Sequence, residues 1–529
     1  MTATPSVLIV GGGLNGLATA LFLAHRGVPC LVAERRSDTC VQYRFRGLSP
    51  RSMEIFRSAG MEDAIRAHRT GDQRSGGLAR VRTLADPDVA WQRIPWAETG
   101  DISPVEAETC DQDVLEPLLR KRAELLGADI RFGTDVTSVS QDARGVTARI
   151  RDTRTGRAET VTAAYLVAAD GAHGTTRSGL GIGRHGPGVL QHWMNVVFDT
   201  DLSPLLQGRR CTSVHVTGIG GSLVPRDGTG RWLLALPYAP PRGEQDRDRD
   251  ERFTPERLRA LIREAAGDPH ARADIVDARP WQVAAYVADR YRAGRAFLVG
   301  DTAHVMPPTG AFGGNTGLHD AYNLAWKLAA VLEGSAGEAL LDSYDTERRP
   351  VAERTLRQAL ARLGTWFPDP EGALPPADPL VDDEAVIFGY RYEAGALVPE
   401  GEPDPEGAVF EDPRRPSGRP GTRAPHVPLH TADGPRSTLD LLGRGFVLLT
   451  GDGPRSADWH TTGLPTECRT AGGERWESAY GVGADGAVLV RPDGHIAWRA
   501  PGIPAQGATA ALRRALTTVL SWTSAPSAV

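Results

Sequence analysis

The amino-acid sequence predicts a mixed α/β protein with several domains. Three observations support this prediction: a strand, a glycine turn and a helix open the chain, short strand-like runs fill residues 185–285, and strand and helix patterns return after residue 295. A chain of 529 residues is also too long for one ordinary hydrophobic core. The order of these patterns predicts that a second sheet is inserted into the first α/β domain.

The chain is expected to begin with a βαβ unit. Residues 6–10 form a continuous apolar run, which is typical of a parallel strand buried on both faces. Apolar side chains then recur at helical spacing over residues 14–26, and a second strand over residues 31–33 ends at Glu34. The same domain is expected to continue in a helix over 111–127, in strands over 129–150 and 158–169, in a strand over 296–299 and in a helix over 317–334.

The middle and the end of the chain differ from this pattern. Short alternating runs between turn residues over 185–285 predict an antiparallel sheet. Residues 366–424 are rich in Pro, Gly, Asp and Glu, which predicts a linker with little core of its own. Strand-like segments and an amphipathic helix over 425–522 predict a small third domain. The expected division is a discontinuous first α/β domain (1–72, 108–182 and 288–365), an inserted sheet domain (73–107 and 183–287), a linker (366–420) and a C-terminal domain (421–529).

Composition argues against several classes of partner. The net charge is −6 and no apolar run approaches the roughly 18 residues that cross a bilayer, so we expect neither nucleic acid nor a membrane as a partner. The five cysteines are far apart and contain no C-x-x-C pair, which argues against a metal site or a disulfide framework. The N-terminus shows no basic leader, so we expect a cytoplasmic protein. We also expect a monomer or a homodimer.

The first glycine-rich turn predicts a dinucleotide site. Gly11, Gly13 and Gly16 follow the first strand in a G-x-G-x-x-G pattern and open the helix after it. Glycines at these positions let the backbone approach a pyrophosphate, whose charge faces the N–H groups of the helix end. Glu34, at the end of the next strand, can accept hydrogen bonds from ribose hydroxyls. The pattern does not distinguish FAD from NAD.

Two further motifs make that distinction. Asp170-Gly171 follows one predicted strand, and Gly300-Asp301 follows another and leads to a glycine-rich stretch at residues 313–317. With the first glycine turn, these motifs make the chain resemble the class A flavoprotein monooxygenases, the para-hydroxybenzoate hydroxylase family, up to about residue 360. The resemblance implies an α/β fold with a Rossmann-type FAD-binding domain and an inserted, mainly antiparallel β-sheet domain that binds the substrate.

The end of the chain supports a narrower resemblance. Residues 421–426 and 490–499 are similar to signatures of the thioredoxin-like C-terminal domain of larger hydroxylases in this family. No C-x-x-C pair accompanies them, so we expect this domain to be structural and not a dithiol catalyst. The three-domain layout resembles the aromatic polyketide hydroxylases and the phenol-catabolic hydroxylases.

The resemblance also implies roles for individual residues. Asp301 would accept a hydrogen bond from the ribityl chain of FAD. The N–H groups of Gly313, Gly314 and Asn315 would open a helix and stabilise negative charge on the reduced flavin. The other cofactor-binding candidates are Arg35, Arg44, Gln112, Asp170 and Gly171. The chain departs from the family at Gly174, where serine is usual, so any hydroxyl contact at that position is lost.

Three residues are catalytic candidates. Arg44 lies in a loop similar to the family's loop beside the flavin and the nicotinamide, and the backbone carbonyl of Pro307 would approach a substrate hydroxyl. Tyr238 could help a phenol to lose its proton, and His215 and Arg209 are alternatives. A spacing of two groups Tyr238 with Trp232, Leu234 and Leu236 on one face of a strand, and the pattern does not show whether this face meets the flavin.

The implied activity is aromatic hydroxylation. FAD would be reduced by NADPH or NADH and would react with molecular oxygen to a flavin C4a-hydroperoxide, which transfers one oxygen atom to an electron-rich ring. The substrate would be a phenolic or polycyclic, polyketide-like aromatic compound, modified in secondary metabolism. Alternatives are a Baeyer–Villiger oxygenase, a catabolic phenol hydroxylase, a flavin dehydrogenase and a non-catalytic FAD-binding regulator.

We expect the substrate to gate the reduction of the flavin by nicotinamide, and Arg44 to belong to the gate. The sequence has no second glycine-rich nicotinamide domain, so the flavin must become accessible, and a cation beside it would guide the anionic cofactor. Stopped-flow reduction should be at least about tenfold faster with the correct phenol, a barrier difference of about 1.4 kcal/mol. Arg44→Ala should keep its FAD and lose most of this acceleration. Equal reduction rates with and without a hydroxylated substrate would contradict the gate, and an unaltered Arg44→Ala profile would contradict the role of Arg44.

Overall fold

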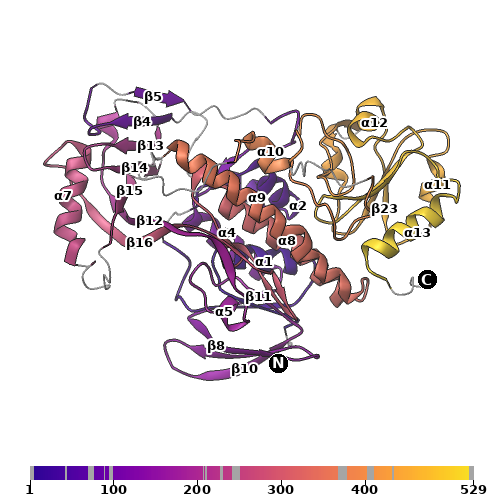
Figure 1. The fold of residues 1–529 in the computed structure, drawn as a ribbon, viewed down its shortest axis with the longest axis horizontal. Coiled ribbons are helices and arrows are strands. Elements are labelled where there is room, and N and C mark those ends of the chain that lie inside the picture. The colour runs from indigo at the N-terminus through magenta and orange to yellow at the C-terminus, as the bar shows by residue number, and fades with distance from the viewer. Residues whose placement is uncertain are drawn as a thin grey trace.

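The structure is a computed structural model that describes most of the chain. The described residues are 5–41, 45–69, 77–87, 90–93, 99–206, 208, 211–226, 230–240, 249, 251–366, 378–401, 410–431 and 434–522. Figure 1 shows a central part with two long helices, an inserted lobe of strands on one side and a C-terminal lobe on the other.

The central sheet is built from the apolar runs of the nucleotide-binding region. Its order is β17 (Arg292–Ala293), β18 (Ala296–Leu298), β11 (Tyr165–Ala168), β1 (Val7–Val10), β2 (Cys30–Glu34) and β7 (Asp129–Phe132). All neighbours except β17 and β18 pair in parallel. β1, β2 and β11 are buried along their whole length, as expected for parallel strands covered on both faces.

Helices pack beside this sheet and connect its strands. α1 (Leu14–His25) packs against both α4 (Gln112–Leu125) and α8 (Phe312–Leu332), and α9 (Ser343–Trp366) runs beside α8 (Figure 1). The smaller elements of this region are β3 (Gly47–Leu48) paired with β6 (Glu108–Thr109), α2 (Pro50–Ser58), α3 (Glu62–Ala67), α5 (Thr176–Gly179) and a three-stranded sheet of β8 (Thr134–Gln141), β9 (Val146–Asp152) and β10 (Ala158–Ala163).

The inserted sheet has eight strands. Its order is β19 (His304–Val305), β16 (Asp274–Ala288), β12 (Arg184–Asp199), β15 (Arg231–Tyr238), β14 (Gly221–Arg226), β13 (Cys211–Val216), β4 (Gly77–Val81) and β5 (Ala90–Arg93). The sheet is antiparallel apart from the parallel pair β4 and β13. β12 and β16 have 16 and 15 residues, so they are much longer than the short runs expected from the sequence.

A helix that the sequence interpretation did not include covers one face of the inserted sheet. α7 (Pro255–Ala266) packs Leu258 and Ile262 into a core that also holds Leu234 of β15. Thr254 caps its first turn by accepting a hydrogen bond from Arg257 N, and Gly267 ends it in the left-handed conformation at φ 72°. These caps are the local reason why the helix begins and ends where it does.

The C-terminal part is a mixed sheet between helices. Its order is β23 (Glu467–Thr470), β22 (Val447–Thr450), β24 (Ala487–Val490) and β25 (Ile496–Ala500), with α11 (Ala457–His460), α12 (Glu474–Tyr480) and α13 (Ala508–Val519) around it and a hairpin of β20 (Pro428–Thr431) and β21 (Gly434–Ser437) before it. Alternate residues of β22 enter different cores: Leu448 packs with Trp459, and Leu449 packs with Trp476. The fold class predicted from the sequence is confirmed.

The segment expected to be a linker has a core in its described part. α10 (Asp383–Phe388) and the residues after it bury Phe388, Tyr390, Tyr392 and Leu397. The two tyrosines and Leu397 pack against Val351 of α9. The expectation of little core therefore does not hold for residues 378–401, because a few scattered aromatic side chains create burial without a periodic pattern.

A buried carboxylate joins the C-terminal part to the central helices. Glu347 of α9 accepts hydrogen bonds from Lys327 Nζ at 2.7 Å and from both terminal nitrogens of Arg491 at 2.8 Å. All three side chains are fully buried. Burial alone would raise the pKa of Glu347, but Arg491 and Lys327 outweigh it and lower that pKa to about 2. Removing one partner would leave a buried charge without compensation, which is strongly destabilising.

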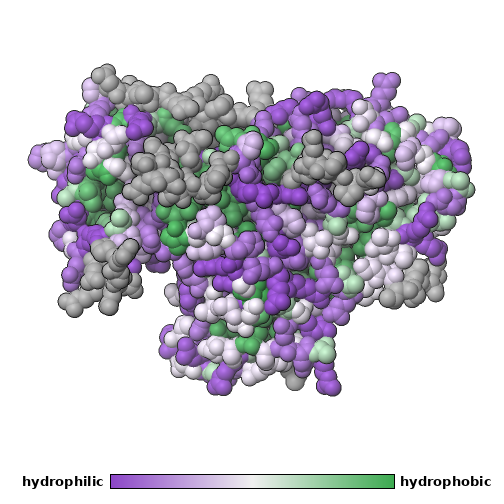
Figure 2. Space-filling view, viewed as in Figure 1, coloured by the Kyte–Doolittle hydropathy of each residue, from purple (hydrophilic) through white to green (hydrophobic). Residues whose placement is uncertain are grey.

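The surface of the molecule is largely polar on one face. Polar and charged residues, in purple, cover much of the face seen in Figure 2. Within the described ranges, no helix is both long enough and apolar enough to cross a membrane.

His495 should make the protein less stable in acid. Burial lowers its pKa to about 4, although Asp493 opposes this effect, whereas an unfolded histidine titrates near about 6.5. Between these values the unfolded chain binds a proton that the folded chain does not, so the free energy of unfolding falls as the pH falls. His495→Gln should remove a loss on the order of 2–3 kcal/mol between pH 7 and pH 4. Chemical denaturation at several pH values measures it, with His68→Gln at an exposed position as the control, and identical pH slopes in all three proteins would contradict the assignment.

Candidate active site

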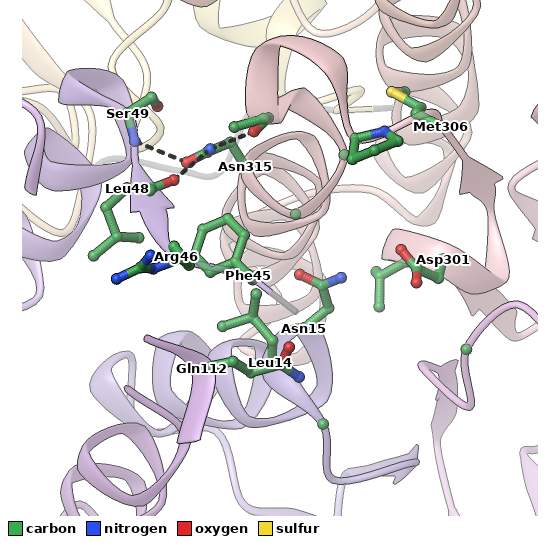
Figure 3. Close-up of a pocket in the computed structure, with 18 of the residues that line it drawn as sticks. Leu14, Asn15, Phe45, Arg46, Leu48, Ser49, Gln112, Asp301, Met306 and Asn315 are labelled. Carbon is green, nitrogen blue, oxygen red and sulfur yellow. Dashed lines mark hydrogen bonds between the residues drawn. The ribbon is translucent and has the colours of Figure 1, made fainter. Parts of the chain in front are cut away.

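A large cavity lies between the central sheet and the inserted sheet. It has a volume of about 1360 Å³, which is more than the roughly 300–1,000 Å³ of a usual single-ligand pocket. Its walls bring together residues that are far apart in the sequence, and Figure 3 shows several of them around one space. The sequence-predicted site residues that line it are Gly11, Gly13, Glu34, Arg35, Gln112, Asp170, Gly171, Asp301, Pro307, Gly313, Gly314 and Asn315.

The glycine turn brings two backbone segments into contact. A Cβ atom at Gly11 would lie 2.4 Å from Ala169 O, and the φ of Gly11 is 102°. A Cβ atom at Gly16 would lie 1.9 Å from Gly11 O. Gly16 itself does not line the cavity, so its role is to let α1 begin against β1. The N-terminal end of α1 thereby faces the cavity, where its N–H groups favour an anion.

Glu34 holds the same turn from the neighbouring strand. Its Oε2 accepts a hydrogen bond from Gly12 N at 2.7 Å, and its Oε1 accepts one from Arg36 N at 2.8 Å. The side chain is buried and still lines the cavity. Each carboxylate oxygen has further lone pairs, so Glu34 can shape the turn and accept a hydroxyl at the same time.

Asp170 explains why the chain has glycine at position 174. Its Oδ2 accepts a hydrogen bond from Thr176 N at 2.9 Å, which folds the carboxylate back over the turn. A Cβ atom at Gly174 would lie 2.1 Å from Asp170 Cγ. The serine that is usual in the family would therefore force Asp170 to move. Gly171, with φ 82°, donates to Thr302 Oγ1 at 2.9 Å and ties this turn to the segment that carries Asp301.

Asn15 lies where the first and last motifs converge, beside the turn that carries Asp301. Asp301 is exposed to the cavity in the turn that follows Gly300. Cβ atoms at Gly300 and Gly317 would lie 2.0 and 2.4 Å from Asn15 Nδ2, so these glycines make the space for Asn15. Asn15 Oδ1 is buried and has no hydrogen-bond partner in the part of the chain that the structure describes. Sequence reasoning missed Asn15 because it occupies a variable position of the glycine motif.

The N-terminal end of α8 is held by the side chain of Asn315. Asn315 Oδ1 accepts a hydrogen bond from Ser49 N at 3.0 Å, and its Nδ2 donates to Gly47 O at 3.0 Å and to Ala311 O at 2.8 Å (Figure 3). Ala311 has φ 55°, a left-handed conformation that strains a residue with a Cβ atom. The ring of Phe45 packs against Gly314, where a Cβ atom would lie 2.4 Å from the Cδ2 atom of that ring.

Two further candidates line the cavity in different ways. Gln112 begins α4, donates its backbone N–H to Phe45 O at 2.9 Å, and donates its side-chain Nε2 to Glu116 Oε1 at 2.7 Å. Pro307 is buried at the cavity wall between β19 and α8. Burial raises the pKa of Glu116, although Cys40 N and the Gln112 amide hydrogen-bond to its carboxylate and oppose this effect.

None of the three substrate-side candidates Arg44, Arg209 and Tyr238 is found in the cavity wall among the described residues. Arg44 and Arg209 lie outside the described residues. Tyr238 does not line the cavity: its ring packs edge-on against Phe253 at a centroid distance of 5.1 Å, on the side of the sheet that α7 covers. Its strand partners Trp232, Leu234 and Leu236 are buried in the same core. The structure therefore does not support Tyr238 as the base, because its strand turns this face away from the cavity.

Apolar side chains that sequence reasoning did not identify also line the cavity. Trp281 of β16 lies in its wall and donates Nε1 to Asn195 Oδ1 at 2.7 Å. Met306 and Phe388 line the same cavity from β19's end and from α10. These residues come from three separate parts of the chain, so no local sequence motif predicts that they share one cavity.

Comparison with known proteins assigns the family. The FAD binding domain family matches residues 4–359, and the family described as aromatic-ring hydroxylase, C-terminal, matches residues 417–522. The chain belongs to the FAD-dependent aromatic-ring hydroxylases. This hydroxylase is an FAD-dependent monooxygenase, and FAD is its cofactor.

The hydroxylase is similar to several known proteins over most of its length. It is 40% identical to 4-methyl-5-nitrocatechol 5-monooxygenase of a Burkholderia species, over 97% of each chain. It is 42% identical to aklavinone 12-hydroxylase DnrF of Streptomyces peucetius, over 86% of this chain and 92% of that protein. A crystal structure of aklavinone-11 hydroxylase in a ternary complex with FAD and aklavinone superposes with a TM-score of 0.88, at 36% identity, over 99% of this chain and 100% of that one.

The residues of the hydroxylase fit FAD. The close approaches at Gly11, Gly300 and Gly314 pack the glycine turns tightly against Ala169, Asn15 and Phe45 at the cavity, where backbone N–H groups can face a pyrophosphate. The unpartnered Oδ1 of Asn15 and the exposed carboxylate of Asp301 supply polar groups beside that backbone. The helix ends of α1 and α8 both open on the cavity and favour the negative charge that this cofactor carries.

Asp301→Ala should lower the affinity for FAD. The substitution removes a charged acceptor, and a hydrogen bond to a charged group contributes on the order of 1.5–3 kcal/mol. We expect the dissociation constant of FAD to rise about 10- to 100-fold, measured by flavin fluorescence during titration of the apoprotein. Asp342→Ala, at an exposed carboxylate that pairs with Arg292, is the control. Wild-type FAD affinity in Asp301→Ala would contradict the role of Asp301.

Acid precipitation of the wild-type protein should release intact FAD, since we expect the flavin to be held without a covalent bond.

Proposed function

We propose that this hydroxylase uses NADPH or NADH and molecular oxygen to hydroxylate a polycyclic, polyketide-like phenol. The observation that carries the proposal is the size of the cavity together with the apolar side chains in its wall. FAD alone does not account for walls contributed by Leu78, Trp281 and Phe388, which belong to the inserted sheet and to α10. A flat aromatic ring system is the ligand that such walls favour.

The relatives support a large aromatic acceptor. Two of the proteins described above are hydroxylases named for aklavinone, and one of them was crystallised with FAD and aklavinone together. The relative named for 4-methyl-5-nitrocatechol marks the alternative, a single-ring phenol. Both alternatives are phenol-type hydroxylations, and they differ in how much of the cavity the substrate fills.

The residues of the chain would bind, orient and protect the reactants. FAD, when bound, supplies the redox chemistry that accepts hydride from the nicotinamide and passes one oxygen atom of O₂ to the ring. The N–H groups at the start of α8, from Gly313 onward, would favour negative charge beside them. Trp281 and Met306 would exclude water from the reacting ring. We assign the Pro307 carbonyl as the acceptor for the substrate hydroxyl, which would hold the ring in one orientation.

Product analysis tests the proposed function. Under ¹⁸O₂, the FAD-loaded protein with NADPH should add one labelled oxygen atom to a polycyclic phenol, with no ring expansion, as read by mass spectrometry and NMR. We expect kcat/KM for polycyclic phenols to exceed that for single-ring phenols by at least about tenfold, or about 1.4 kcal/mol of transition-state binding. A preference for single rings would contradict the proposed substrate class, and insertion of oxygen into a ring ketone would contradict hydroxylation.

A pair of tryptophan variants tests the wall. Trp281→Phe removes the hydrogen bond to Asn195 at the cavity and should raise KM for a polycyclic phenol several-fold. Trp193→Phe is the matched control, because Trp193 packs 6.1 Å from Trp281 between ring centroids and does not line the cavity. Equal KM values in both variants would contradict the assignment of Trp281 to the substrate-binding wall.

A further inference from the structure

A row of buried hydrogen bonds leads from the segment after α10 to the FAD site. Tyr390 Oη lies 3.4 Å from His319 Nδ1, and His319 Nε2 lies 3.1 Å from Ser52 Oγ. Ser52 Oγ then lies 2.6 Å from Asn315 Oδ1. All four side chains are at least nine-tenths buried, so water cannot replace these contacts.

The directions of two hydrogen bonds in this row follow from the Asn315 amide at its end. Asn315 Oδ1 accepts from Ser49 N, so the oxygen of the amide is the atom that faces Ser52. An amide oxygen has no proton to give, and Ser52 must therefore donate its single hydroxyl proton to Asn315. The contact between Ser52 and His319 can then form only if His319 Nε2 carries a proton and donates it.

His319 must also be neutral if Tyr390 is to donate to it, because a protonated ring has no acceptor nitrogen. Burial lowers its pKa well below the ordinary value, and the charges of Arg348 and Arg51 act in the same direction. With the proton on Nε2, the neutral ring has an acceptor at Nδ1, and Tyr390 donates its hydroxyl proton there. The three donors point the same way, from Tyr390 toward Asn315.

The end of the row controls the geometry at the cavity. Once Ser52 and Ser49 fix the amide oxygen of Asn315, its Nδ2 must face the carbonyls of Gly47 and Ala311. Gly47 and Ala311 both line the cavity, and Ala311 is the strained residue before α8. A rotated amide would place an oxygen against two carbonyl oxygens, which is repulsive and leaves buried groups unsatisfied.

We propose that Tyr390, His319 and Ser52 are positioning residues for FAD, which act by fixing the orientation of the Asn315 amide. They would hold the Gly47 loop and the strained start of α8 in the arrangement that the cavity needs to bind FAD. The inference rests on the FAD cofactor and does not depend on the substrate proposed above. It also gives the C-terminal part a route to the site, because His495 packs against Tyr390 at a centroid distance of 5.5 Å.

His319 variants test the proposed direction of the row. His319→Leu removes the donor to Ser52, whereas His319→Gln retains an N–H group that can reach it. We expect His319→Leu to release FAD at least about tenfold faster than wild type, or about 1.4 kcal/mol, and to shift the visible absorption bands of the bound flavin. His319→Gln should restore most of the wild-type release rate and spectrum. Wild-type FAD release and spectrum in His319→Leu would overturn the proposal, and so would a His319→Gln variant as defective as His319→Leu.

A second set of variants separates positioning from stability. Ser52→Ala removes the donor to Asn315 with little change of volume and should reproduce the faster FAD release if His319→Leu does not fold. Tyr390→Phe should also release FAD faster than Tyr392→Phe, since the Tyr392 hydroxyl bonds Arg348 outside the row. Tyr344→Phe loses a buried hydroxyl that donates to Leu298 O and should lower the thermal midpoint without changing the flavin spectrum. If Ser52→Ala behaves like Tyr344→Phe, the row is only structural and the proposal is wrong.

Discussion

The ionised carboxylate of Glu347 is the interaction on which the arrangement of the domains depends. It sits without solvent contact between Lys327 of α8 and Arg491 of the C-terminal sheet, so neither element can shift without leaving a charge buried and unpaired. α8 begins at the cavity, in the turn at Ala311, and ends beside the C-terminal core. The carboxylate therefore fixes the helix whose first residues line the cavity, and the C-terminal domain helps to hold the site although its residues contribute no dithiol.

The parts of the site that the sequence predicted are those formed by short stretches of chain. The turn at Gly11, the carboxylate at Glu34 and the segment that carries Asp301 each combine a buried strand with a polar or glycine residue directly after it. Parallel strands place such ends along one edge of a sheet, so the local pattern is enough to bring them to one cavity. Gly174 shows how a departure from a family motif can also be local, because the folded-back carboxylate of Asp170 occupies the space that a side chain would need.

The remaining features depend on contacts between distant segments. The alternation of side chains along β15 shows that Tyr238 shares one face of the strand with Trp232 and Leu234. It does not show which face of the sheet is covered, because the covering helix α7 lies in a separate stretch of sequence. Its capping residues Thr254 and Gly267 are visible in the sequence and could have revealed it. No comparable signal exists for the buried row at Asn315, since its members come from α2, α8 and the segment after α10. The composition of the segment after α10 predicts a linker, but its aromatic side chains pack against α9 and are buried.

The parallel pairing of β4 with β13 has a consequence for how the protein is made. β4 and β5 leave the ribosome long before β13, the strand that lies on the other side of β4 in the finished sheet. Until β13 emerges, β4 presents an open edge of unpaired N–H and C=O groups, and Ala79 and Val81 have not yet met their core. Such an edge can pair with a neighbouring nascent chain. Slow translation of the stretch between these strands would therefore lengthen the time for which this edge stays open.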